Sequence, residues 1–193
     1  MKKVLLIAAS VMALPHVHAA PYAELLIGSA TQQASFQGVK GRSESDILLG
    51  LRGGFQFTDN IAAELSWVKY GEPQWSHIDD WGDRITQDVS ADAFLVGLMG
   101  ILPLHQAFAV NARAGLAFWN LDLEETDSAF PGEVFSLSTS GNNFYFGLGG
   151  EYQINDNIHI GLEYSMLTME VEVLGMSIDY DVNSALLYTG WRF

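Results

Sequence analysis

Residues 182–193 read VNSALLYTGWRF and carry the clearest structural signal in the chain. In an extended strand, successive side chains point to opposite faces of the sheet. One face of this stretch is then mostly apolar and ends in Trp191 and Phe193, whereas the other face is mixed and includes Arg192. Apolar side chains toward lipid and aromatic side chains at the interface are typical of closed sheets in a bilayer. The stretch therefore predicts a transmembrane β-strand.

The N-terminus has the features of a secretory signal peptide. Lys2 and Lys3 supply positive charge, residues 4–14 form an apolar run, and Ala19 offers a small residue for cleavage. That run is too short to span a bilayer as a helix, which needs ~20 residues. We expect a signal peptide over residues 1–19 and one mature domain over residues 20–193.

Composition narrows the class of protein. The chain has 193 residues, no cysteine and a formal net charge of −14. Without cysteine an exported chain has no disulfide framework, and the acidic balance argues against a nucleic-acid partner, because phosphate binding needs a basic footprint. After the expected signal, no apolar run approaches ~18 residues, although 49% of the chain is hydrophobic. A β-barrel fits both observations, since it carries its apolar content in alternation.

Seven further segments alternate in the same way as the last one. The expected strands are residues 22–30, 47–57, 61–70, 89–102, 108–121, 143–154 and 158–171. Short turns near Asp59, His105 and Asp156 alternate with long polar segments, expected as loops over residues 32–45, 71–87, 122–141 and around Gly175. The pattern predicts an all-β fold, an eight-stranded antiparallel up-and-down transmembrane β-barrel whose short turns and termini are periplasmic. Eight strands leave an interior that side chains fill.

A soluble eight-stranded barrel of the lipocalin kind is the rival fold. It needs its apolar face inside, which would crowd Phe144, Phe146 and Trp191 into the cavity. The same register would place Arg113 and the glutamates of the opposite face outside. The membrane barrel therefore accounts better for the alternation.

Five short motifs carry a resemblance to a known family: GILPL at 100–104, ARAGL at 112–116, GGEY at 149–152, LEY at 162–164 and GWRF at 190–193. They resemble the OmpA-like family of eight-stranded outer-membrane barrels, of the OmpA transmembrane-domain or OmpX type. The resemblance implies a place in the outer membrane of a Gram-negative bacterium, among its lipid and lipopolysaccharide. It also implies that the barrel-assembly machinery reads Trp191 and Phe193 as an assembly signal. We expect a monomer.

Members of that family keep a charged network inside the barrel, and the inward charges that correspond here are Arg52, Glu64, Arg113, Glu151 and Glu163. Charges in a narrow lumen cost several kcal/mol unless they are paired. We therefore interpret the five as a structural ion-pair network, with a proton or ion path as the alternative. Arg113 should contact Glu64, Glu151 or Glu163. Relatives often carry a basic residue where this chain has Gly161, which argues against a family-style ion gate.

The sequence offers no catalytic constellation. A serine nucleophile needs a base beside it, but His159 precedes Ile160 and Gly161 instead of forming the His-x-Ser pattern of lipid A deacylase barrels. We expect no enzymatic activity, no cofactor and no metal site. The acidic residues of the expected loops are interpreted as solvated charge gathered at one rim, although hard cations such as Ca²⁺ favour such oxygens: Asp79, Asp80, Asp83, Glu124, Glu125, Asp127, Asp179 and Asp181.

The sequence predicts function only by class. The leading hypothesis is a small structural or surface-interaction barrel whose outer loops meet a host or surface ligand, as in adhesion or colonisation. The alternatives are a narrow, porin-like channel for ions or solutes and a lipid A-modifying enzyme. Trp75 and Trp81, in an expected loop, are candidate interface anchors or partner contacts.

Overall fold

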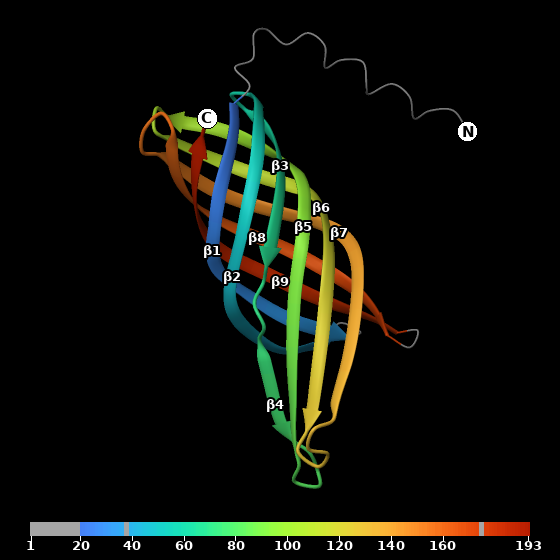
Figure 1. Cartoon of the computed structure of the whole chain (residues 1–193). Coiled ribbons are helices and arrows are strands. Elements are labelled where there is room, and N and C mark those ends of the chain that lie inside the picture. Colours follow the sequence, from blue (N-terminus) through green and yellow to red (C-terminus); the bar gives the residue numbers. More distant parts are fainter. Residues whose placement is uncertain (1–19, 37–38, 174–175) are drawn as a thin grey trace, which may run out of the picture.

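The computed structural model describes residues 20–36, 39–173 and 176–193 (Figure 1). The expected signal peptide and the expected loop residue Gly175 lie outside these residues. Within them, no helix is long and apolar enough to cross a membrane. The strands are β1 (Ala20–Phe36), β2 (Val39–Thr58), β3 (Ile61–Lys69), β4 (Gln74–Ile78), β5 (Arg84–His105), β6 (Phe108–Asp127), β7 (Val134–Gln153), β8 (Ile158–Val173) and β9 (Met176–Arg192).

The nine strands of the described residues form one antiparallel sheet that closes on itself. β1 lies between β2 and β9, and the other end of the sheet closes because β3 also pairs with β5. β3 pairs with residues 92–100 of β5, and β4 pairs with residues 84–88 of the same strand. β3 and β4 are thus two pieces of one stave, which here means one strand position in the wall of the barrel. Over residues 20–36, 39–173 and 176–193 the barrel has eight staves, and the predicted fold class is confirmed.

The two ends of the barrel differ. At one end, called the turn end, tight turns join β2 to β3, β5 to β6 and β7 to β8, and β1 begins and β9 ends there (Figure 1). At the opposite end, called the hairpin end, the strands continue far past the middle of the barrel. β5 is 22 residues long, which exceeds the ~9–11 residues that a membrane strand needs.

The prediction of long loops was therefore wrong. β1 extends to Phe36, β6 extends to Asp127, and β4 lies inside the expected loop of residues 71–87. The reason is visible in β6, where Leu121 and Leu123 still point inward while Asp122 and Glu124 face water. Alternation continues there, but charged outward side chains give these segments the composition of a loop.

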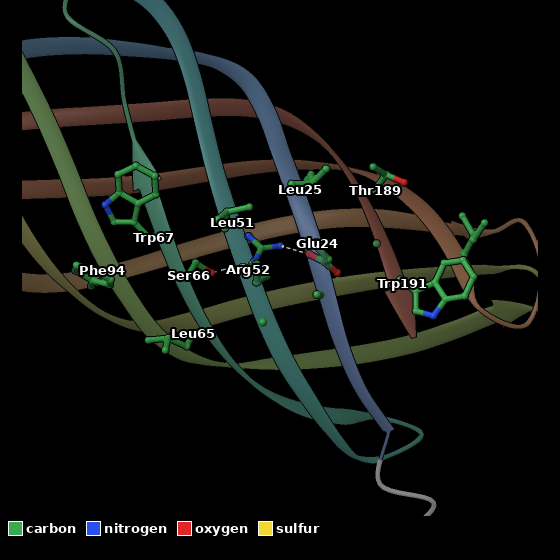
Figure 2. A pocket seen from close by; sticks show the side chains of 14 residues that line it. Glu24, Leu25, Leu51, Arg52, Leu65, Ser66, Trp67, Phe94, Thr189 and Trp191 are labelled. Carbon is green, nitrogen blue, oxygen red and sulfur yellow. Dashed lines mark hydrogen bonds and ion pairs between the residues drawn. The ribbon is translucent and has the colours of Figure 1, made fainter. Parts of the chain in front are cut away.

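The outward side chains form an apolar band around the turn end and the middle of the barrel. Figure 2 shows one part of it, where Leu25, Leu51 and Leu65 surround a hollow of about 640 Å³ and the side chains of Glu24 and Arg52 pair with each other. On each stave a polar outward residue marks where the band ends toward the hairpin end: Ser29, Ser45, Lys69, Asp92, Asn120, Asn142, Thr168 and Asn183.

Within the band, the soluble rival fold fails. Phe144 and Phe146 point outward and are 69% and 54% exposed, whereas Arg113 is buried inside. Beyond the band the polarity is reversed, because apolar side chains such as Trp119, Leu121 and Met169 fill the interior and polar ones face out. One barrel thus has an outer surface suited to lipid and a projecting part suited to water.

The interior of the hairpin end also holds a few satisfied polar groups. Tyr180 donates a hydrogen bond to Gln32 Oε1 at 2.8 Å, and Gln32 Nε2 donates to the Tyr70 carbonyl at the same distance. Burial raises the pKa of the Tyr180 hydroxyl. The side-chain amide of Gln32 therefore has hydrogen-bond partners although it is buried in the apolar interior.

Candidate functional site

Two arginines organise the charges in the lumen. Arg52 on β2 lies 3.0 Å from Glu24 Oε2 of β1 and 2.9 Å from Glu163 Oε2 of β8. Arg113 on β6 lies 2.9 Å from Glu64 Oε2 of β3 and 3.1 Å from the same Glu163 oxygen. All five residues are 5% exposed or less. These five form the lumen charge cluster, in which Glu163 bridges the two guanidinium groups across the barrel.

Neutral side chains complete the cluster. The Tyr22 hydroxyl donates to Glu64 Oε1 at 2.7 Å, and Arg113 Nη1 donates to Asn111 Oδ1 at 2.6 Å. Asn111 in turn donates to the Tyr188 hydroxyl at 2.8 Å. The Tyr188 ring lies 5.2 Å from the Arg113 guanidinium carbon, within cation–π range. Glu64 and Arg113 are therefore held by hydrogen bonds as well as by ion pairs, which offsets part of their desolvation.

Two glycines make room for the lumen tyrosines. A Cβ at Gly54 would lie 2.1 Å from Tyr22 Cζ, and a Cβ at Gly161 would lie 2.1 Å from Tyr188 Cζ. Such distances are far below van der Waals contact. The Tyr188 ring thus occupies the space next to Gly161 that a longer side chain would need.

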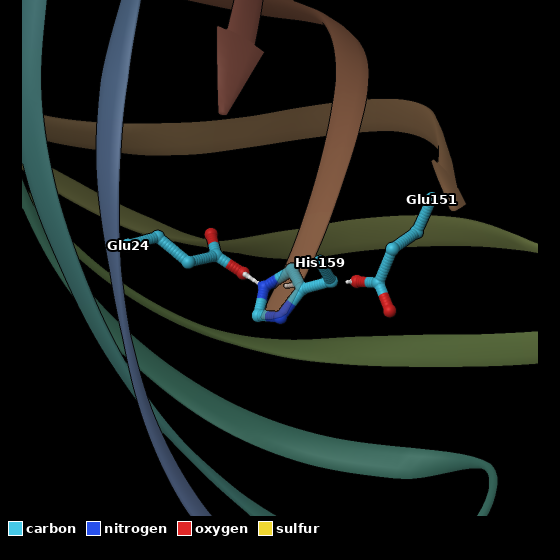
Figure 3. Close-up of side chains that lie close together, drawn as sticks. All are labelled: Glu24, Glu151 and His159. Atoms are coloured by element: carbon cyan, nitrogen blue, oxygen red, sulfur yellow. Dashed lines mark hydrogen bonds and ion pairs between the residues drawn. The ribbon is translucent and has the colours of Figure 1, made fainter. Parts of the chain in front are cut away.

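A second group lies nearer the turn end. His159 Nε2 is 2.9 Å from Glu24 Oε1 and 4.0 Å from Glu151 Oε2 (Figure 3). Glu151 Oε1 in turn pairs with Arg192. Tyr22 and Tyr188 place their rings edge-on to the imidazole, with centroids 6.1 Å away in both cases. Residues 20–36, 39–173 and 176–193 contain one group of carboxylates and histidine whose side-chain atoms lie close enough together to hold a metal ion. It consists of Glu24, Glu151 and His159.

The structure brings together four of the five lumen residues expected from the sequence: Arg52, Glu64, Arg113 and Glu163. Arg113 contacts two of the three carboxylates that we considered for it. Glu151 instead pairs with Arg192 at the mouth of the barrel.

The sequence-based network omitted two central residues, Glu24 and His159. Both had a signal, because Glu24 alternates with outward Ala23 and Leu25, and His159 alternates with outward Ile160. Their contact could not be predicted from the sequence, because Glu24 and His159 are 135 positions apart.

A different surface lies at the hairpin end. The outer tip, defined as residues 78–84 and 124–135, combines the ends of the β4–β5 and β6–β7 hairpins. The two ends touch, since Ser128 Oγ accepts a hydrogen bond from the Arg84 backbone at 2.8 Å. Exposed apolar side chains cover this tip: Ile78, Trp81, Phe130, Val134 and Phe135. Acidic side chains accompany them: Asp79, Asp80, Asp83, Glu124, Glu125, Asp127 and Glu133.

Some acidic residues of the outer tip have local hydrogen-bond partners. Asp79 Oδ1 accepts backbone hydrogen bonds from Trp81 and Asp83 and so shapes the β4–β5 turn. Asp181, expected at the same rim, bonds to Thr168 on a different part of the barrel. Of the two expected tryptophan contacts, Trp75 packs against the apolar interior and Trp81 is 89% exposed.

Comparisons with known proteins agree with this architecture. The family model for the outer membrane protein beta-barrel domain matches residues 4–193. A search of curated protein sequences found no match.

Three solved structures share the fold at low sequence identity. Ail, the attachment invasion locus protein of Yersinia pestis, solved with the heparin analogue sucrose octasulfate, is 16% identical, with a TM-score of 0.54 over 90% of this chain and 99% of that chain. Neisserial surface protein A is 10% identical, with a TM-score of 0.59 over 86% and 95%. OprG from Pseudomonas aeruginosa is 15% identical, with a TM-score of 0.55 over 92% and 98%. At these identities the likeness concerns the fold.

Proposed function

The chain belongs to the outer membrane protein β-barrel domain family, and from this membership we propose that it is a closed barrel that binds a cationic partner at the cell surface. Outer-membrane barrels have short periplasmic turns, so the turn end faces the periplasm and the hairpin end faces outward. The proposed role is non-enzymatic and is carried out by a monomer. It includes adhesion or colonisation as the process served.

The observation that carries this proposal is the outer tip. Trp81, Phe130 and Phe135 expose most of their surface to water there, well beyond the apolar band. Exposed apolar patches with a polar rim mark interaction sites. Arg84 is the one basic residue in the tip, so its field is negative and favours a partner with basic residues around an apolar contact.

The negative charge of the outer tip argues against a ligand like the one bound to a structural neighbour. Ail was solved with a heparin analogue, sucrose octasulfate, which is a polyanion. The acidic outer tip would repel such a ligand. We therefore propose a protein or peptide surface carrying Lys or Arg as the partner.

The interior supports a binding role over transport. The lumen charge cluster crosses the barrel, and apolar side chains pack in the interior above it. We further propose that the apolar band contacts outer-membrane lipid and lipopolysaccharide. Trp191 and Phe193 end the closing strand with exposed aromatic side chains, which suits recognition by the barrel-assembly machinery.

Adherence of whole cells tests the proposal. Gram-negative cells that display the wild-type chain should adhere to an epithelial layer more than cells without it. The triple variant Trp81→Ser, Phe130→Ser, Phe135→Ser should abolish the difference, and added salt or soluble polylysine should reduce wild-type adherence because charge contributes to it.

The matched control is Leu104→Ser, which removes an exposed apolar side chain at the turn end. It should adhere like the wild type. Equal adherence of the triple variant and the wild type, at equal surface amounts, would contradict the proposal.

A further inference from the structure

We propose that Glu24, Glu151 and His159 form a binding site for a divalent transition-metal ion, of which Zn²⁺ is the type, at the periplasmic end of the lumen. This site is separate from the outer tip and does not depend on the proposed surface role. The three donor atoms lie within 4.8 Å of one another, and all three residues are buried.

The carboxylate oxygens are divided between arginine and histidine. Glu24 Oε2 lies 3.0 Å from Arg52 Nη1, and Glu24 Oε1 faces His159 Nε2. Glu151 gives Oε1 to Arg192 and turns Oε2 toward the same nitrogen at 4.0 Å. Each arginine thus holds a carboxylate in place, as the outer partners of metal ligands do, and leaves one oxygen of each carboxylate facing the imidazole.

The charged side chains of the lumen carry an excess of negative charge. In the part of the chain that the structure describes, the lumen charge cluster and the mouth together hold four carboxylates, Glu24, Glu64, Glu151 and Glu163, against three guanidinium groups. One negative charge is left over when His159 is neutral. Because this excess is negative, it attracts a cation to the carboxylate oxygens of Glu24 and Glu151 that face His159.

The site has an approach from the periplasm. A cavity of about 300 Å³ opens at the turn end, and its lining includes Glu151, Arg192, Gln56 and Gln153. Glu151 therefore faces this cavity with one side and His159 with the other. An ion entering the cavity meets a ligand at its inner wall.

The donor set selects the class of ion. Imidazole nitrogen suits zinc, copper, nickel and iron, whereas Ca²⁺ and Mg²⁺ favour oxygen ligands alone. One nitrogen and two carboxylate oxygens leave a further position for water, as in many zinc sites. Tyr22 and Tyr188 flank the imidazole from two sides and fix its plane.

Calorimetric titration of Zn²⁺ into the refolded chain at neutral pH tests the site. We expect saturable binding of one ion per barrel. Glu151→Gln and His159→Gln should each weaken binding by at least about tenfold, since even outer partners of ligands change affinity by ~10–100-fold. His77→Gln, which alters an exposed histidine on β4, should bind like the wild type. Co²⁺ titrated in place of Zn²⁺ should give a visible absorption band that His159→Gln removes.

Three outcomes would overturn the site. The first is no saturable heat with wild-type protein. The second is unchanged affinity in both site variants. The third is loss of binding in His105→Gln with retention in His159→Gln, which would place the ion on the exposed turn. A shift in gel migration on boiling verifies that each variant is folded, and Glu151→Gln keeps the test decisive if His159→Gln does not fold.

Discussion

At the scale of single residues, Arg113 and Arg52 determine the chemistry of the lumen. Each guanidinium contacts carboxylates from two other strands, and Glu163 is common to both. Removing one partner of a buried pair leaves the other charge without compensation, which costs more than the pair itself contributes. The stability of the barrel should therefore respond far more strongly to a change in the lumen than to an equal change at the surface.

We expect Arg113→Ala to lower the free energy of unfolding by about 3–5 kcal/mol, because it leaves Glu64 and Glu163 short of a buried cation. Arg42→Ala is the matched control. Its side chain is 74% exposed and pairs with Glu44 at the surface, so its loss should cost less than about 1 kcal/mol. Denaturant unfolding in lipid or detergent measures both, and equal effects would show that the lumen ion pairs add nothing to stability.

At the scale of strands, alternation predicted most staves correctly. In β1 and β8 the two faces differ clearly, and the outward apolar residues of the sequence are outward in the structure. β5 could not be oriented in this way, because Phe94, Val96 and Leu98 on one face oppose Ala91, Ala93 and Leu95 on the other. Its inner face belongs to the apolar interior, which local sequence cannot distinguish from a lipid face.

The closing strand is the element that we expect the assembly machinery to read. Phe193 is exposed, and its backbone nitrogen donates to the Pro21 carbonyl at 3.0 Å, so its side chain adds little to packing. Phe193→Ala should therefore lower the amount of folded barrel in the outer membrane severalfold with little change in the stability of the refolded protein. Phe144→Ala removes an equally exposed aromatic from β7 and should assemble normally. Similar losses in both variants would contradict an assembly signal at Phe193.

The site was less predictable than the strands for a geometric reason. Sequence alternation told us that Glu64, Arg113 and Glu163 point inward. It could not tell which inward residues meet, because contacts across a barrel depend on how far each strand is shifted against the next. Glu24 and His159 meet only because β1 and β8 both pair with β9, which brings them to the same level.

At the scale of the whole molecule, the barrel reverses its polarity along its axis. Around the turn end and the middle it is apolar outside with charges inside, and at the hairpin end it is polar outside with an apolar interior. The first part suits the outer membrane, and the second suits water outside the cell. This reversal also explains why composition alone misread the strand extensions as loops.

Conductance in planar bilayers tests the closed barrel most directly. We propose that the lumen charge cluster and the apolar interior close the axis in series, so refolded wild-type protein should insert and give no discrete current steps. A porin measured in the same bilayers supplies the positive control, and a shift in gel migration on boiling shows that the inserted protein is folded. Stable, ohmic current steps from the folded wild-type barrel would contradict the account and favour a channel.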